Sequence, residues 1–131
     1  TVNSTLAVLP APAAAGVSAE GRVAALRAPE SFVLRIRELH EAGQVQLVDV
    51  REPHEWDIGR IEGARLTPLS SFADALRSLD SARDVVVYCK SGVRSAKAVR
   101  QLRAAGFRRV WNLEGGILRW SEEIDPTVPR Y

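Results

Sequence analysis

The chain has 131 residues, of which 46% are apolar and 26% charged, an ordinary composition for one soluble globular domain. It rules out a disordered tail, a collagen-like repeat and a disulfide-stapled miniprotein. No apolar run approaches the ~20 residues that cross a bilayer, so we expect no membrane association. The 18 basic and 16 acidic residues are spread along the chain without a basic block, so nucleic acid is not an expected partner either.

The first residues differ in composition from the rest. We interpret residues 1–22 as an Ala/Pro-rich linker or N-terminal extension, and residues 23–131 as the folded domain. A secretory signal is not expected, because the apolar stretch lacks a basic start and is interrupted by prolines, and we therefore expect a cytoplasmic protein. The sequence contains no Met, which favours a fragment of a longer protein.

Beyond this segment, short apolar runs alternate with helical patterns. The predicted strands are 23–26, 45–50, 64–69, 85–88 and 110–113. The predicted helices run from Pro29 to just before Gly43, over 53–58, from a capping box at Ser71 and Asp74, over about 95–105, and after Gly115–Gly116. This alternation predicts an α/β domain with a buried parallel sheet.

Cys89 is the only cysteine, which excludes an internal disulfide. One Cys and two His do not complete a structural zinc site without carboxylates, and we expect no bound metal. Cys89 follows the most continuous apolar run and precedes a helical pattern, which places it at the carboxyl end of a strand. Backbone N–H groups of the following loop and the helix N-terminus would favour a thiolate there, so we interpret Cys89 as a nucleophile.

The loop that follows Cys89 is the predicted substrate-binding segment. It consists of Lys90, Ser91, Gly92, Val93 and Arg94. Lys90 and Arg94 would attract anionic donors, and Gly92 permits the backbone conformation that such a loop needs. Tyrosine-phosphatase loops are one residue longer, because they surround a tetrahedral phosphoryl group. The shorter ring favours transfer of a single sulfur atom through a Cys89 persulfide and disfavours a Cys-based phosphatase.

Four segments, in this order, resemble the rhodanese domain: 48–56, 61–64, 89–94 and 113–120. Residues 124–131 are similar to the end of one subgroup, the C-terminal rhodanese domain of molybdopterin-synthase adenylyltransferase/sulfurtransferase proteins. The resemblance implies a five-stranded parallel sheet flanked by helices on both faces. It also implies a thiosulfate sulfurtransferase-like enzyme that needs no cofactor beyond the transient persulfide on Cys89.

The same resemblance implies partners. The sulfur donor would be thiosulfate or the persulfide of a cysteine desulfurase. The acceptor would be a ubiquitin-like sulfur carrier protein, whose C-terminus becomes a thiocarboxylate in the biosynthesis of molybdopterin or a related cofactor. The parent chain would then carry an adenylating domain. A free-standing thiosulfate sulfurtransferase and a docking role within a larger enzyme remain alternatives.

Three further residues are expected near the loop: Asp49, Arg51 and Ser95. Asp49 would either position the loop or satisfy N–H groups at its own strand end. Arg51 would either support the loop or form a structural ion pair with Asp49 or Glu55. The remaining candidates have simpler interpretations: surface positions for His40 and His54, packing for Trp56, Trp111 and Trp120, and a tight turn for Gly115–Gly116.

Overall fold

The computed structural model describes residues 30–131. Its strands are β1 (Val45–Asp49), β2 (Arg65–Leu66), β3 (Asp84–Tyr88) and β4 (Val110–Asn112). Its α-helices are α3 (Glu30–Glu41), α4 (Pro53–Ile58), α5 (Phe72–Ala75), α6 (Val93–Ala104) and α7 (Gly116–Glu123). Two short 3₁₀-helices, η1 (Leu69–Ser71) and η2 (Leu76–Ser78), flank α5. The predicted linker at 1–22 and the predicted strand at 23–26 lie outside the described residues.

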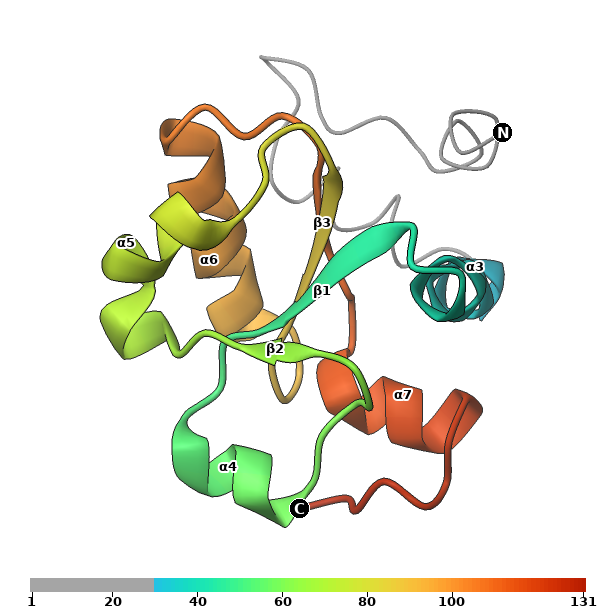
Figure 1. Cartoon of the computed structure of the whole chain (residues 1–131). Helices are drawn as coiled ribbons and strands as arrows, with labels where there is room; N and C mark the ends of the chain where they lie inside the picture. Colours follow the sequence, from blue (N-terminus) through green and yellow to red (C-terminus); the bar gives the residue numbers. More distant parts are fainter. Residues whose placement is uncertain (1–29) are drawn as a thin grey trace.

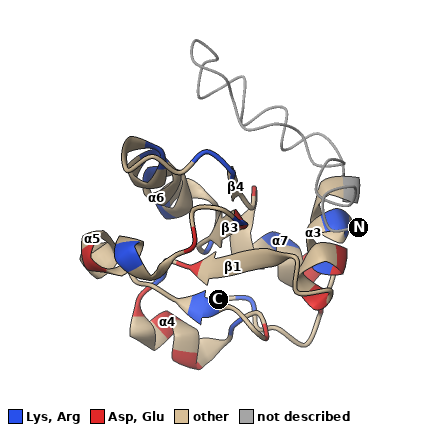
Figure 2. Ribbon diagram, turned by 45° about the horizontal axis from the view of Figure 1, so that its top comes forward, with Lys and Arg blue, Asp and Glu red and all other residues tan. Residues whose placement is uncertain are grey.

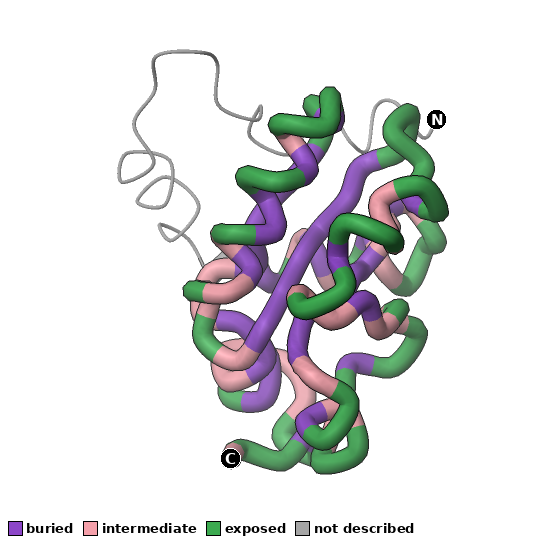
Figure 3. The backbone as a smooth tube through the Cα atoms, turned by 90° about the vertical axis from the view of Figure 1, so that its left-hand side faces the viewer, coloured by how far each residue is buried: buried purple, intermediate pink, exposed green. Residues whose placement is uncertain are grey.

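The strands form a parallel sheet in the order β2-β1-β3-β4 (Figure 1). The central strand β3 pairs with β1 on one side and β4 on the other, and all five of its residues are buried (Figure 3). A strand covered on both faces needs a continuous apolar run, which is what residues 85–88 supply. The predicted parallel sheet is confirmed, with four of its strands among the described residues rather than the five expected.

Helices cover both faces of this sheet, as predicted (Figure 1). The side chains of β3 alternate between the faces, with Val86 directed to α3 and α7 and Val87 directed to α5 and α6. Ile36 of α3 and Ile117 of α7 complete the first core, and Leu102 of α6 lies in the second. Trp111 and Trp120 belong to the first core, which confirms packing roles for both.

Two predicted elements differ from the structure. The capping box at Ser71 and Asp74 is wrong, because the Ser71 side chain makes no capping hydrogen bond and α5 spans only four residues. The Asp74 side chain is one methylene shorter than the Glu that closes such a box. The predicted strand 64–69 pairs as a strand only over Arg65–Leu66, because the chain then bends into η1.

The start of α7 contacts the backbone that follows β3. The N–H of Ile117 donates to the carbonyl oxygen of Cys89 over 2.9 Å. Gly116 has φ +59°, and a Cβ atom at this position would lie 2.4 Å from the carbonyl oxygens of Cys89 and Lys90. The turn at Gly115–Gly116 is therefore a structural requirement, because only glycine lets the helix approach the loop so closely.

Replacing Gly116 with Ala tests this close approach. Gly43 is the matched control, because its φ is +71° but a Cβ there would meet nothing within 4 Å. Gly43→Ala should cost about 1–2 kcal/mol of unfolding free energy from the left-handed backbone alone. Gly116→Ala should cost about 1–3 kcal/mol more, because the methyl group is forced against backbone atoms. Urea unfolding measures both, and equal losses would contradict the packing argument.

Candidate active site

The Cys89 sulfur lies between the end of β3 and the first turn of α6, next to the loop that joins them. The side chain is buried, with 1% of its surface exposed. Its Sγ accepts hydrogen bonds from the backbone N–H of Gly92 at 3.1 Å and of Ser95 at 3.4 Å. Gly92 precedes α6 with φ +113°, so the first turn of that helix also faces the sulfur. This arrangement can stabilise negative charge on a sulfur atom.

The side chains of the loop differ in their exposure to solvent. Val93 is 75% exposed, and Ser91 is also exposed. The ammonium of Lys90 lies 4.6 Å from the centre of the Tyr131 ring, a cation–π contact at the side of the loop. The loop thus directs backbone N–H groups to the sulfur, while the side chains of Ser91 and Val93 are exposed to solvent.

Arg94 forms a bidentate ion pair with Glu55 of α4. Its Nη1 and Nη2 donate to the two carboxylate oxygens at 2.6 and 2.8 Å. The hydrogen bond from Arg94 is the main cause that lowers the pKa of Glu55 to about 2, against the opposing effect of burial. The same pairing raises the pKa of Arg94. The charge of Arg94 is thus balanced by a carboxylate, which the sequence did not predict.

Asp49 and Arg51 form a buried ion pair at the end of β1, with neither side chain exposed. The shortest of their contacts joins Nη2 to Oδ2 at 2.7 Å, and the backbone N–H of Arg51 also donates to Asp49. Arg51 reaches Glu55 only at its backbone carbonyl. Of the partners considered for Arg51 from the sequence, the structure therefore selects the Asp49 side chain.

Tyr131 connects these two ion pairs. Its hydroxyl accepts a hydrogen bond from Arg51 Nη1 at 2.9 Å and donates to Glu55 Oε2 at 2.6 Å. The resulting chain of hydrogen bonds joins the end of β1 to the start of α6. Sequence reasoning missed this role of Tyr131, because Tyr131 and Glu55 are 76 positions apart and no local pattern relates them.

Asn112, at the end of β4, is a second residue that sequence reasoning missed. Its Nδ2 donates to the Gly92 carbonyl at 3.1 Å, and its Oδ1 accepts from the Ser95 hydroxyl at 2.6 Å. The Ser95 Oγ itself lies 3.4 Å from Cys89 Sγ. The available signal was a polar residue, Asn112, that interrupts the otherwise apolar run from 110 to 113.

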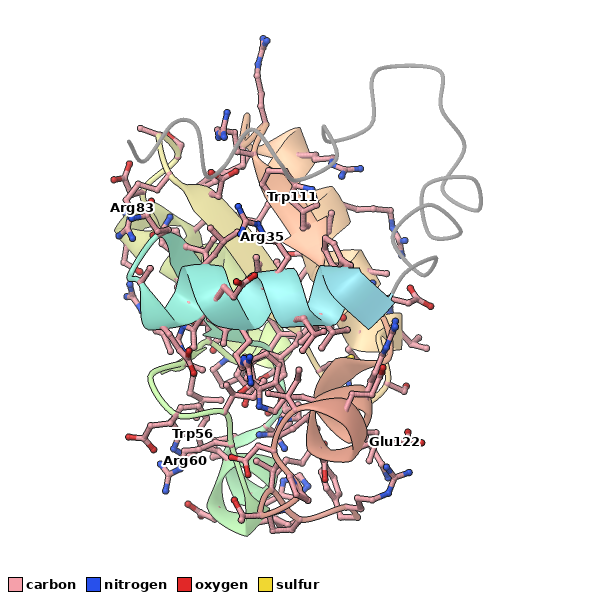
Figure 4. All side chains as sticks on the ribbon, turned by 90° about the vertical axis from the view of Figure 1, so that its right-hand side faces the viewer. Arg35, Trp56, Arg60, Arg83, Trp111 and Glu122 are labelled. Carbon is pink, nitrogen blue, oxygen red and sulfur yellow. The ribbon has the colours of Figure 1, made fainter. Side chains whose placement is uncertain are left out.

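Several features of the described residues lie outside the Cys89 site. Helix α6 carries basic residues and no acidic ones, whereas α4 carries acidic residues and no Lys or Arg (Figure 2). No group of three metal-ligating side chains occurs between residues 30 and 131. Within the same range, no helix is long and apolar enough to cross a membrane. A hollow of about 440 Å³ lies between α3 and α7, and its lining includes no residue of the Cys89 loop. Trp56 stacks with Arg60 at the end of α4 (Figure 4).

Comparison with known proteins identifies the fold family. The sequence profile of the Rhodanese-like domain matches residues 34–123. The chain belongs to this family. This rhodanese-like domain is 39% identical over 90 residues to a protein of Allochromatium vinosum named "Sulfurtransferase". The match covers 69% of this chain and 84% of that one. The crystal structure of a rhodanese-related protein from Thermoplasma volcanium matches with a TM-score of 0.65 at 31% identity, covering 76% of this chain and 95% of that one.

A longer relative supports the subgroup resemblance. The rhodanese-like domain is 37% identical over 119 residues to the Mycobacterium tuberculosis protein named "Probable adenylyltransferase/sulfurtransferase MoeZ". The match covers 88% of this chain and 30% of that relative. The predicted membership of the rhodanese family, with its similarity to adenylyltransferase/sulfurtransferase proteins, is confirmed.

The Glu55–Arg94 pair should make the stability of the domain depend on acid pH. Because Glu55 titrates at about 2 when folded and near 4.5 otherwise, its contribution is complete above pH 4.5 and is lost as the pH falls towards 2. Glu55→Gln should cost up to about 3 kcal/mol of unfolding free energy at pH 7 and nothing near pH 2. Urea unfolding between pH 2 and 7 measures whether the unfolding free energies of the variant and the wild type become equal as the pH falls.

The matched control is Glu122→Gln, since the Glu122 side chain is 69% exposed (Figure 4). It should lower stability little at any pH, because exposed ion pairs contribute little. A Glu55→Gln curve that stays parallel to the wild-type curve throughout would contradict the assigned role of the pair.

Proposed function

We propose that this domain is a sulfurtransferase that carries sulfane sulfur as a persulfide on Cys89. The observation that supports this most strongly is the convergence of the Gly92 and Ser95 N–H groups on a buried Cys89 Sγ at the start of α6. Donors fixed in this way stabilise a thiolate or persulfide anion without a neighbouring general base. Sulfurtransferase names among the relatives agree with this chemistry.

The proposed reaction has two balanced steps. The Cys89 thiolate attacks the outer sulfur of thiosulfate, a new S–S bond forms, and sulfite leaves with the electron pair of the broken S–S bond. A nucleophile such as cyanide then attacks the outer sulfur of the persulfide and leaves as thiocyanate. The electron pair of the second broken bond returns to Cys89 as thiolate, so no external oxidant or reductant is needed.

A phosphatase is the less favoured candidate. Four residues separate Cys89 from Arg94, a ring that suits one added sulfur atom better than a tetrahedral phosphoryl group. In addition, Nη1 and Nη2 of Arg94 are both hydrogen-bonded to the Glu55 carboxylate. A phosphoryl group would have to displace this carboxylate before Arg94 could bind it.

For the pathway, we propose that the domain supplies sulfur for the thiocarboxylation of a ubiquitin-like carrier in the biosynthesis of molybdopterin or a related cofactor. The support is the similarity to an adenylyltransferase/sulfurtransferase of which this chain covers only 30%. The parent chain would then hold the adenylating domain and act in the cytoplasm. The alternative is a free-standing thiosulfate sulfurtransferase, favoured by the relative whose length the chain covers to 84%.

Intact-protein mass spectrometry tests the proposal. The wild-type domain should gain one sulfur atom after brief exposure to thiosulfate or to the persulfide of a cysteine desulfurase, and should lose it when cyanide is added. Cys89→Ser should gain nothing under the same conditions, because a hydroxyl does not form the persulfide. Loading by the desulfurase alone would identify a protein donor, whereas no gain from either donor would overturn the sulfurtransferase proposal.

A further inference from the structure

Asn112 occupies a position in the sheet that directs its side chain to the reactive cysteine. It pairs in register with Val87 across the β3–β4 ladder, and Cys89 follows Val87 by two residues. Side chains two positions apart share one face of a strand, so Asn112 and Cys89 lie on the face that α6 covers. Asn112 is itself buried, with 6% of its surface exposed.

The hydrogen bonds of Asn112 fix the orientation of its amide group. The Gly92 carbonyl oxygen can only accept, so the group 3.1 Å from it must be the donating Nδ2. The Oδ1 atom therefore faces the Ser95 hydroxyl at 2.6 Å and must accept from it. This assignment follows from the donor and acceptor types of the partners and leaves no freedom to flip the amide.

One carboxamide thus holds both residues that donate to the sulfur. Gly92 and Ser95 supply the two N–H groups that reach Cys89 Sγ, and Asn112 is bonded to each of them. The Ser95 hydroxyl has a single proton, which points to Asn112. Towards Cys89 Sγ, at 3.4 Å, Ser95 Oγ presents a lone pair, which accepts the proton of a thiol but repels a thiolate.

We infer that Asn112 is a positioning residue that sets the reactivity of Cys89 by fixing the direction of the Ser95 hydroxyl. When Cys89 loses its proton to solvent, the Ser95 hydroxyl can donate to the thiolate only by leaving Asn112. Asn112 therefore favours the resting thiol, while its bond to Gly92 keeps one of the backbone donors in place. The inference rests on the proposed function only in taking the thiolate as the reactive form.

Other charged and titratable groups lie near this end of the sheet. They are Lys90 and Arg94 of the loop, Asp49 and Arg51 after β1, Glu55 of α4, and the hydroxyls of Tyr88 and Tyr131. All of them stay unchanged in the variants proposed below. Their influence therefore cancels when the variants are compared.

The test is the rate of Cys89 alkylation by iodoacetamide as a function of pH, in four proteins: wild type, Asn112→Ala, Ser95→Ala and the double variant. With Ser95 present, Asn112→Ala frees the hydroxyl to donate to the thiolate and should move the profile to lower pH. In the Ser95→Ala background there is no hydroxyl to free. The effect of Asn112→Ala on the rate at pH 7 should differ between the two backgrounds by at least about threefold.

Two further variants complete the design. Gln46→Ala is the matched control, because the Gln46 amide also both donates and accepts a hydrogen bond. Its partner is the Asp80 backbone, near the start of β1 and away from Cys89. Gln46→Ala should leave the alkylation profile unchanged. Asn112→Asp preserves the acceptor for Ser95 and the side-chain shape but adds negative charge, so its profile should move to higher pH.

These outcomes separate the inference from the proposed function, because alkylation needs no sulfur donor. The role of Asn112 would be overturned if Asn112→Ala changed the alkylation rate by the same factor with Ser95 and with Ser95→Ala. It would also be overturned if Asn112→Asp moved the alkylation profile to lower pH, even if persulfide forms normally. A clear coupling between Asn112 and Ser95 would support that role even if no persulfide forms. The absence of a persulfide would overturn only the sulfurtransferase proposal.

Discussion

The tight backbone turn between Tyr88 and Ser95 brings a strand end, a helix start and one sulfur atom within hydrogen-bond distance of one another. Helix α7 packs against the carbonyl groups of Cys89 and Lys90 at Gly116, where a Cβ atom would not fit. With these carbonyls engaged from outside, the N–H groups further along the loop close on the sulfur. The loop backbone therefore has two sets of contacts: carbonyl groups bonded to α7, and N–H groups bonded to the Cys89 sulfur.

Around this turn, buried charges are arranged in compensating pairs. Asp49 with Arg51, and Glu55 with Arg94, are joined through the hydroxyl of Tyr131. A buried charge without its partner costs several kcal/mol, so each pair constrains the other to remain in place. The network connects the end of β1, α4 and the start of α6.

Much of this architecture could be predicted from the sequence, because the relevant patterns are local. The apolar run from 85 to 88 indicated a strand of a buried sheet, and the loop and helical pattern after Cys89 placed the cysteine at a strand end. These features depend on burial and on residues that are neighbours in the chain. The family resemblance added the expectation of helices on both faces, which the two cores confirm.

What could not be predicted depends on polar partners that only the tertiary fold brings together. The Arg94–Glu55 pair spans 39 positions, and the contact of Asn112 with Gly92 spans 20. Their formation depends on strand register and helix placement to within an ångström, which periodicity does not encode. The capping box at Ser71 failed for the opposite reason: a local motif was overridden by the path of the chain through η1 and α5.

The role of the backbone donors can be measured by NMR of the ¹⁵N-labelled domain before and after sulfur loading, with loading verified by mass. Converting Cys89 to a persulfide changes the charge and position of the acceptor that faces the amides of Gly92 and Ser95. These two amide signals should show the largest shifts in the spectrum, and cyanide should reverse them. A loaded protein in which both signals keep their positions would contradict the account.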